Sequence, residues 1–280
     1  MAIVFALGAA MAFGSADFAG GLASRRTPAL LVALGTQLAG VAVLVVALPL
    51  LGAASPAPRD LLLGAVGGLF GGTGLVILFR ALAQGPMSVV APTTALSASL
   101  VPIAGGLLLG DRPGLTVALG IVVSLVAVVL ITHERHPDGH RVAVDRKVLA
   151  MSLGSGALFG LFFVFLHQTS SASGLWPLAA ARVASIPLLA ALAIRRGSSA
   201  SLAQLRFTPV LLVSGVLDMG ANIFYLLALR HGMLAVVAAV TGLYPASTVV
   251  LAQSHLQERM RPLQLAGLGA AACAAILIAV

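Results

Sequence analysis

Residues 81–113 of this chain read ALAQGPMSVVAPTTALSASLVPIAGGLLLGDRP, and residues 227–260 read LALRHGMLAVVAAVTGLYPASTVVLAQSHLQERM. An ungapped alignment of this region at a separation of 147 residues gives 11 identities in 42 positions. Apolar segments share some matches by composition alone, but here the glycines also coincide, and each segment ends in an acidic residue followed by arginine (Asp111 and Glu258). The pattern predicts an internal repeat that covers both halves of the chain.

The composition of the chain is typical of a membrane protein. Hydrophobic residues make up 60% of the 280 residues and charged residues 9%, with a mean hydropathy of +1.09. A soluble domain carries about a quarter charged residues. The chain divides into about ten apolar stretches of roughly 20 residues, each long enough to cross a bilayer as a helix. We therefore expect an all-α polytopic membrane protein.

The apolar stretches predict ten transmembrane helices. We expect them at residues 2–23, 28–51, 60–83, 87–109, 113–132, 148–168, 175–194, 208–229, 233–254 and 262–280. Residues 1–132 then form one five-helix repeat, residues 133–147 a linker, and residues 148–280 a second five-helix repeat. Because each repeat has an odd number of helices, the second must be inverted relative to the first, an arrangement typical of secondary transporters.

The loop charges predict an orientation. Twelve of the 16 Lys and Arg residues fall in odd-numbered loops, which the positive-inside rule places in the cytoplasm, with both chain termini outside. The basic residues are scattered over short loops without interleaved aromatics, so we expect no nucleic-acid partner. We expect a multi-pass protein of the cell (inner) membrane.

The two quoted segments, each a helix pair ending in an acid–arginine dipeptide, resemble the EamA branch of the drug/metabolite transporter superfamily. Arg182 in ARVASIPLLAALA resembles the arginine that opens the second helix of each family repeat, but the first half offers Gln37 instead. The resemblance implies a cavity lined by helices 1–4 and 6–9, with helices 5 and 10 as outer supports. It also implies cytoplasmic termini, which conflicts with the loop charges.

The eighth predicted span carries a polar stripe. Ser214, Asp218, Asn222 and Tyr225 fall on one helical face, which indicates either a water-filled cavity or a hydrogen-bond network between helices. Ionisable residues inside a membrane are costly and are typical of proton relays and substrate sites. Asp218 is therefore our first candidate for proton coupling or for binding a substrate amine.

Two further charged residues lie inside predicted spans. Asp17, in FGSADFAGG, is the second candidate for these roles, with a structural role near Arg25 and Arg26 as the alternative. Arg182 can hold a carboxylate through two hydrogen bonds. Its partner is then either a substrate carboxylate or one of the two aspartates.

Hydroxyl-bearing side chains on the fourth and ninth spans complete the predicted site. Ser and Thr often bond back to their own helix, so each of these residues has a structural alternative. With Gln37 and the residues above, the candidates for substrate binding or proton coupling are Thr93, Thr94, Ser97, Thr241 and Tyr244.

These observations favour a secondary transporter that moves a small organic solute by alternating access. Export of an amino-acid-like or amphipathic solute, with or without proton coupling, is the leading interpretation. An importer or facilitator for a sugar or similar solute is the alternative, with a membrane-embedded enzyme or a channel as remote ones. We expect no catalytic residues, cofactor or metal, and either a monomer or a homodimer in the lipid bilayer.

Overall fold

The computed structural model describes residues 1–51, 56–131, 145–195, 208–256 and 262–279, so most of the predicted linker 133–147 lies outside the described residues. Within these ranges the chain forms helices joined by turns and loops, and no β-strand. The helices are α1 (Ala2–Ser24), α2 (Ala29–Leu50), α3 (Pro58–Gln84), α4 (Met87–Leu108), α5 (Leu115–Ile131), α6 (Arg146–His167), the short 3₁₀ helix η1 (Ser171–Ser173), α7 (Trp176–Arg195), α9 (Pro209–Leu229), α10 (Leu234–Thr241), α11 (Pro245–Leu256) and α12 (Pro262–Ala279).

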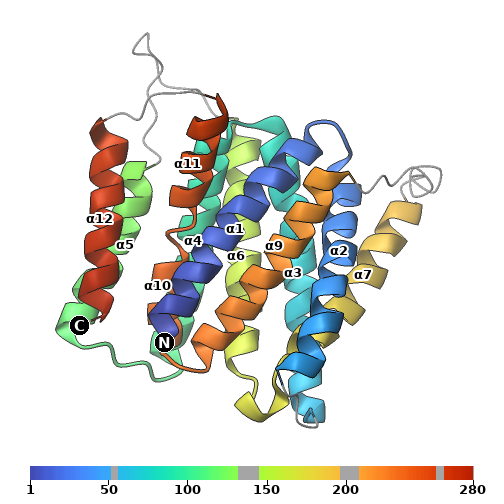
Figure 1. Cartoon of the computed structure of the whole chain (residues 1–280), viewed down its shortest axis with the longest axis horizontal. Coiled ribbons are helices and arrows are strands. Elements are labelled where there is room, and N and C mark those ends of the chain that lie inside the picture. Colours follow the sequence, from blue (N-terminus) through green and yellow to red (C-terminus); the bar gives the residue numbers. More distant parts are fainter. Residues whose placement is uncertain (52–55, 132–144, 196–207, 257–261, 280) are drawn as a thin grey trace.

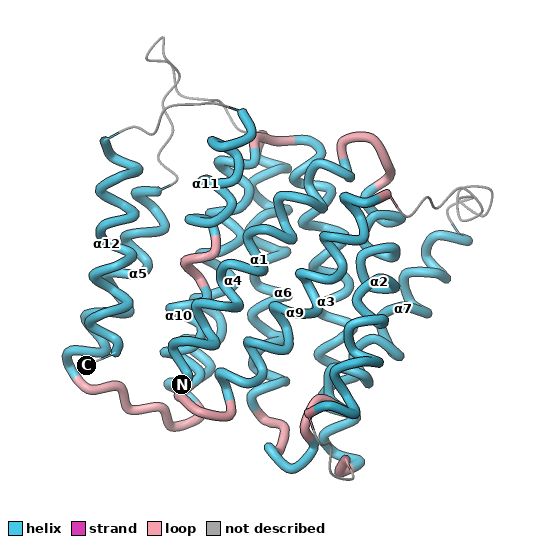
Figure 2. Tube along the Cα trace, in the orientation of Figure 1, coloured by secondary structure: helices cyan, strands magenta, loops and turns pink. Residues whose placement is uncertain are grey.

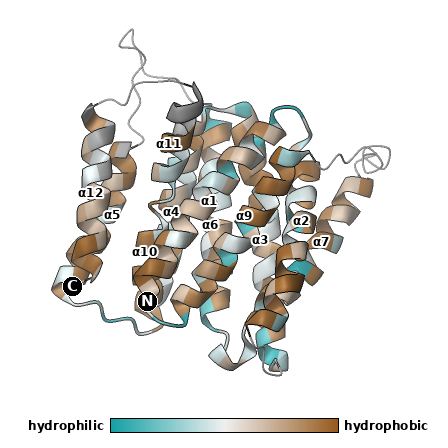
Figure 3. Ribbon diagram, in the orientation of Figure 1, coloured by the Kyte–Doolittle hydropathy of each residue, from teal (hydrophilic) through white to brown (hydrophobic). Residues whose placement is uncertain are grey.

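The described helices are those of a multi-pass membrane protein. Seven of them are long and apolar enough to cross a bilayer, namely α1, α2, α3, α4, α6, α7 and α9. Three shorter apolar helical segments lie at Leu115–Leu130, Leu234–Thr248 and Gly269–Ala279. Hydrophobic colouring runs along much of each helix, whereas several hydrophilic residues lie at helix ends (Figure 3).

Proline and capping side chains mark where several helices begin. Pro28 and Pro86 stand immediately before α2 and α4, and Pro209 begins α9. Proline suits these positions because the first amides of a helix have no partner within it. Asp145 accepts a hydrogen bond from the Lys147 amide at 2.9 Å and so caps α6.

One predicted helix was wrong. The ninth span, expected to be continuous over 233–254, is divided into α10 and α11 by a turn at residues 242–244 (Figure 2). Pro245 cannot donate to the carbonyl four residues earlier, and its ring clashes with that carbonyl in a continuous helix. Gly242 also packs so closely on the Ser99 hydroxyl that a Cβ atom would clash there. The break therefore places the turn directly against α4.

The helices pack in matching pairs across the two halves of the chain. Helix α1 packs on α9 as α6 packs on α3, and α2 packs on α9 as α7 packs on α3. In the same manner α4 packs on α6, while α1 packs on α10 and α11. Helices α5 and α12 pack on each other at one end of the bundle (Figure 1). Helix α1 begins, and helix α12 ends, at the same end of the bundle, where N and C are marked in Figure 1.

Two glycines separated by 147 residues permit equivalent close contacts. A Cβ atom on Gly68 of α3 would collide with the Ala181 backbone of α7. A Cβ atom on Gly215 of α9 would collide with the Thr36 carbonyl and the Ala39 side chain of α2. Glycine at these positions allows the helix backbones to approach closely.

The loop between α6 and α7 is held by polar contacts from both halves. Asp60, which is buried, accepts hydrogen bonds from the Ser170 amide at 3.0 Å and the Ser173 hydroxyl at 2.6 Å. Arg230, just beyond α9, donates to the carbonyl and hydroxyl oxygens of Thr169. Burial lowers the pKa of Arg230 from its ordinary value, and the charge of Asp60 opposes this effect. These contacts tie α3, the α6–α7 loop and α9 together at the end of the bundle that carries the chain termini.

Candidate substrate cavity

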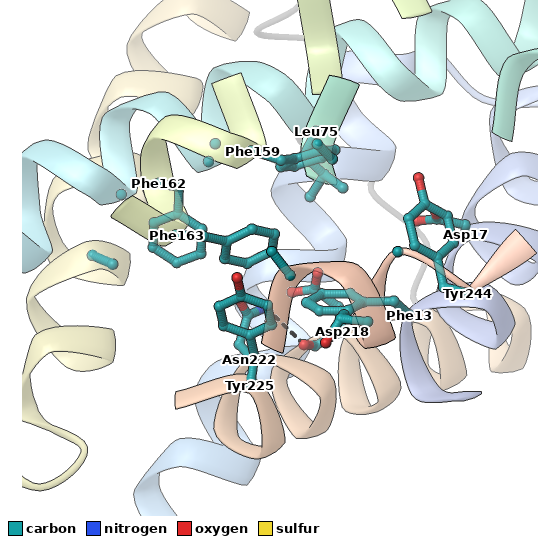
Figure 4. Close-up of a pocket in the computed structure, with 18 of the residues that line it drawn as sticks. Phe13, Asp17, Leu75, Phe159, Phe162, Phe163, Asp218, Asn222, Tyr225 and Tyr244 are labelled. Atoms are coloured by element: carbon teal, nitrogen blue, oxygen red, sulfur yellow. Dashed lines mark hydrogen bonds between the residues drawn. The ribbon is translucent and has the colours of Figure 1, made fainter. Parts of the chain in front are cut away.

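A cavity lies in the middle of the bundle, between helices of both halves (Figure 4). Helices α1, α3, α4, α6, α7, α9 and α10 line it, together with the turn after α10. Its lining consists of Phe13, Asp17, Gly68, Gly71, Gly72, Leu75, Ala98, Ser99, Phe159, Phe162, Phe163, Ala181, Arg182, Asp218, Asn222, Tyr225, Ala238, Thr241, Gly242 and Tyr244. None of these residues comes from α2, α5 or α12. The lining therefore lacks α2, which the family resemblance places at the cavity.

One wall of the cavity carries an ion pair between α7 and α9. The Nη2 atom of Arg182 lies 2.6 Å from Oδ2 of Asp218, and each side chain is 13% exposed. The Nε atom of Arg182 is buried and has no hydrogen-bond partner among the described residues. Of the partners that the sequence analysis considered for Arg182, the structure therefore pairs it with Asp218. The Nε–H group of the guanidinium has no described acceptor.

The predicted polar stripe of α9 continues along the same wall. The side-chain amide of Asn222 donates to the main-chain oxygen of Asp218 at 2.7 Å. Within the described structure, Oδ1 of Asn222 and the hydroxyl of Tyr225 are buried without a partner. The Tyr225 ring stacks on Phe163 with centroids 3.9 Å apart. Asp218, Asn222 and Tyr225 therefore face the cavity together, as their spacing predicts.

Asp17 lies in another part of the cavity, close to Tyr244 (Figure 4). It is 9% exposed, and it makes no hydrogen bond or ion pair with any residue that the structure describes, Arg25 and Arg26 included. The Tyr244 hydroxyl donates instead to the Ala91 carbonyl of α4 at 3.3 Å. Asp17 is thus a buried carboxylate without a neutralising partner in the described part of the chain.

Aromatic side chains that the sequence analysis did not single out complete the cavity wall. Phe159, Phe162 and Phe163 come from α6, and Phe13 comes from α1. The rings of Phe13 and Phe163 lie 5.9 Å apart and those of Phe162 and Phe163 5.5 Å apart. One signal was available, because Phe13 precedes Asp17 by four residues and so shares its helical face.

The polar residues predicted on α4 lie outside this lining. Ser97 donates back to the carbonyls of Thr93 and Thr94, at 3.3 and 3.2 Å. A Cβ atom on Gly156 of α6 would collide with the Ser97 hydroxyl and the Thr94 carbonyl. These residues therefore contribute to the close contact between α4 and α6, whereas Ser99, which was not predicted, reaches the cavity.

Three other predicted residues make contacts between helices. Gln37 is fully buried and accepts a hydrogen bond from Ser185 of α7, and Gln37 does not line the cavity. Ser214 donates to the Ala16 carbonyl at 3.0 Å, also outside the cavity lining. Thr241 does line the cavity, and its hydroxyl donates to the Ala6 carbonyl at 3.4 Å.

Comparison with known families supports the sequence resemblance. The EamA-like transporter family matches this chain twice, over residues 1–133 and over residues 146–280. The chain belongs to the EamA-like transporter family. This confirms the resemblance to the drug/metabolite transporter superfamily that the repeated segments indicate.

A solved crystal structure resembles this EamA-family protein over nearly its whole length. The TM-score is 0.68 at 15% sequence identity, and the alignment covers 97% of this chain and 94% of the other. At that identity the likeness concerns the fold alone. A search of curated proteins found no match.

Proposed function

We propose that this EamA-family protein is a secondary transporter that carries a small organic solute through the central cavity by alternating access. The observation that carries the proposal is the cavity itself, in which two buried aspartates and the largely buried Arg182 lie among aromatic side chains from both halves of the chain. Charged residues inside a membrane protein typically mark a pathway for substrate or ions. An amino-acid-like or amphipathic solute suits this lining, and export is the direction we propose.

We further propose that residues 1–132 and 148–280 are inverted five-helix repeats that rock about this cavity. The double family match supports this division. So do the matching helix pairs, in which α1 packs on α9 as α6 packs on α3. The equivalent glycine contacts of Gly68 and Gly215 add further support. Binding sites between such repeats are typical of secondary transporters.

Proton coupling is assigned in this proposal to the pair of Arg182 and Asp218. A proton bound to Asp218 would remove the charge that holds the guanidinium, so that Arg182 is released when Asp218 is protonated. The free Nε of Arg182 supports such exchange of partners. Because the pair joins α7 to α9, its opening would loosen one helix contact of the cavity wall.

The test uses purified protein in liposomes that contain a pH-sensitive dye. A panel of amino acids, amines, sugars and cationic drugs is added under an imposed proton gradient, and counterflow of each labelled solute is measured without a gradient. We expect saturable counterflow of at least one solute and a proton flux that depends on that solute. Asp218→Asn should abolish the proton flux while counterflow persists.

The matched control is Ser15→Ala, because Ser15 bonds back to Met11 of α1 and does not line the cavity. A proton flux unchanged in Asp218→Asn would refute the coupling role, and a single-channel current in place of saturable counterflow would refute the carrier. Saturable counterflow confined to sugars would favour the facilitator alternative.

A further inference from the structure

The charges that line the cavity do not cancel. Asp17, Arg182 and Asp218 are the charged side chains among its described lining residues. Arg182 and Asp218 form a 2.6 Å ion pair and neutralise each other. Asp17 therefore leaves one uncompensated negative charge in the cavity when it is ionised. An uncompensated carboxylate attracts a cation and repels an anion.

Asp17 is also free to accept a ligand. Its side chain is buried, and no described residue donates a hydrogen bond to it. A buried carboxylate without a donor is costly to maintain, and the cost falls when a cationic partner binds. The nearby hydroxyl of Tyr244 is directed to Ala91 of α4, so it does not satisfy this requirement.

The surroundings of Asp17 suit an organic cation better than a metal ion. Carboxylate, carbonyl and water oxygens form the sites of hard metal cations. Here the cavity that Asp17 lines is instead mostly apolar and aromatic, with Phe13 on the same helical face as Asp17 and Phe159, Phe162 and Phe163 on α6. Aromatic faces attract organic ammonium groups and also accommodate apolar carbon. No group of three or more His, Cys, Asp or Glu residues suited to a metal occurs in the described structure.

Helix α9, which packs on α1, offers hydrogen bonds to a second polar group. Oδ1 of Asn222 and the hydroxyl of Tyr225 are buried without partners among the described residues. Both lie on the α9 face that carries Asp218, whereas Asp17 lies on α1. A solute in the cavity could therefore be held at one group by Asp17 and at another by the α9 side chains.

We propose that Asp17 binds the protonated amine of a small organic cation with an aromatic or branched apolar body, and that Asn222 and Tyr225 bind a polar group at its other end. This inference rests on the proposed transport function and names its class of substrate. It moves the amine-binding role from Asp218, our first candidate, to Asp17, because Arg182 already neutralises Asp218.

Three probes of similar shape test the head group. Phenethylamine is a cation at neutral pH, 2-phenylethanol is neutral, and 3-phenylpropionate is an anion. Equilibrium binding to purified protein in nanodiscs is measured at one fixed pH by displacement of labelled phenethylamine. We expect the protein to bind phenethylamine at least tenfold more tightly than 2-phenylethanol, because a hydrogen bond between charged groups is stronger than one to a neutral hydroxyl. We expect 3-phenylpropionate to bind most weakly, because its carboxylate is repelled by that of Asp17.

Two variants of Asp17 and one control complete the experiment. In Asp17→Asn we expect the affinities for amine and alcohol to differ by no more than about twofold, within the scatter of neutral hydrogen bonds. Asp17→Glu should recover most of the preference for the amine. Ser15→Ala on the same helix should bind all three probes as the original protein does. The melting temperature of each variant shows whether it is folded.

Several results would overturn the inference. One is a wild-type protein that binds the amine no more tightly than the alcohol. Another is an Asp17→Asn variant that keeps the preference, even if its proton-driven flux is lost, because Asp17 would then carry protons and not the amine. Loss of all three probes in folded Asp17→Asn would show that the carboxylate shapes the cavity without recognising charge. Counterflow of other solutes in liposomes would leave the transport function standing in each case.

Discussion

The two aspartates of the cavity differ in one respect that decides their chemistry. Asp17 and Asp218 are each 9% exposed when the whole residue is counted, and both line the cavity. Asp218 has a cationic partner at 2.6 Å, while Asp17 has no described partner. Burial alone therefore does not assign a role to an acid in a membrane. A paired acid can hold helices together and exchange its partner, whereas an unpaired acid is available to a ligand.

The comparison predicts that the largest loss of stability comes from breaking the ion pair of Arg182 and Asp218. Arg182→Met should leave Asp218 buried without its partner and lower the stability by about 3–5 kcal/mol, the usual range for breaking a buried pair. The proton-driven flux should be lost as well. Thermal unfolding in detergent, followed by size-exclusion chromatography, measures the first effect, and the pH-sensitive dye in liposomes measures the second.

The double variant Arg182→Met with Asp218→Leu sharpens that test. Replacement of both ions by apolar side chains is often neutral for stability, so its melting temperature should return close to the original value. The proton-driven flux should remain absent because the exchangeable pair is gone, whereas counterflow without a gradient should persist, as in Asp218→Asn. A double variant less stable than Arg182→Met would contradict the interpretation that the lost stability comes from the unpaired charge.

Steric changes near each aspartate should affect its proposed role separately, with a somewhat smaller loss of stability. Gly68→Ala would press α3 against the backbone of Ala181, next to Arg182, and Gly14→Ala would press α1 against the Tyr244 carbonyl near Asp17. Overpacking costs about 1–3 kcal/mol. We expect Gly68→Ala to impair proton-driven flux most, and Gly14→Ala to impair amine binding most, in the two assays above.

Gly220→Ala is the matched control, because a Cβ atom on Gly220 of α9 would have no neighbour within 4 Å. It should leave both readouts and the melting temperature close to those of the original protein. Equal effects of Gly68→Ala and Gly14→Ala on both readouts would contradict the separate roles proposed for Asp218 and Asp17.

Neutralising each aspartate should change stability in opposite directions. Asp17→Asn removes an uncompensated buried carboxylate and should raise the stability by about 1–2 kcal/mol, less than the roughly 2.5–3.5 kcal/mol cost of a central charge. Asp218→Asn leaves Arg182 without its anion and should lower the stability. Melting temperatures of the two variants at the same pH check the signs, and a decrease in both would show that Asp17 is paired after all.

The smallest expected effects concern the two tyrosines of the cavity. Tyr244→Phe removes a hydrogen bond to Ala91 and should cost about 0.5–1.5 kcal/mol of stability. Tyr225→Phe removes a hydroxyl without a described partner and should leave stability nearly unchanged. If the Tyr225 hydroxyl binds the solute, that variant should raise KM in counterflow without lowering the melting temperature. Equal melting temperatures of the two variants would refute the assigned difference.

Particular elements show how far local pattern predicts this protein. The apolar stretches placed most helices within a few residues, since length and hydropathy are local properties. The α9 spacing correctly brought Asp218, Asn222 and Tyr225 to one face, and that face lines the cavity. The ninth span was misjudged because its break depends on Pro245 together with the contact of Gly242 on α4. The same limit applies to Ser97 and Gln37, whose hydroxyl and amide serve helix contacts that no single-helix pattern reveals.

The sequence by itself determined the membrane class, the family, the repeat and the two aspartates inside predicted spans, Asp17 and Asp218. Those features follow from composition, spacing and motif, which are properties of the chain before it folds. Only the tertiary structure decided which acid is paired, because Arg182 and Asp218 are 36 residues apart on different helices. Their meeting depends on how α7 and α9 are rotated and packed. The same packing brings the phenylalanines of α6 into the cavity that Asp17 of α1 lines, and so combines an unpaired charge with an aromatic wall.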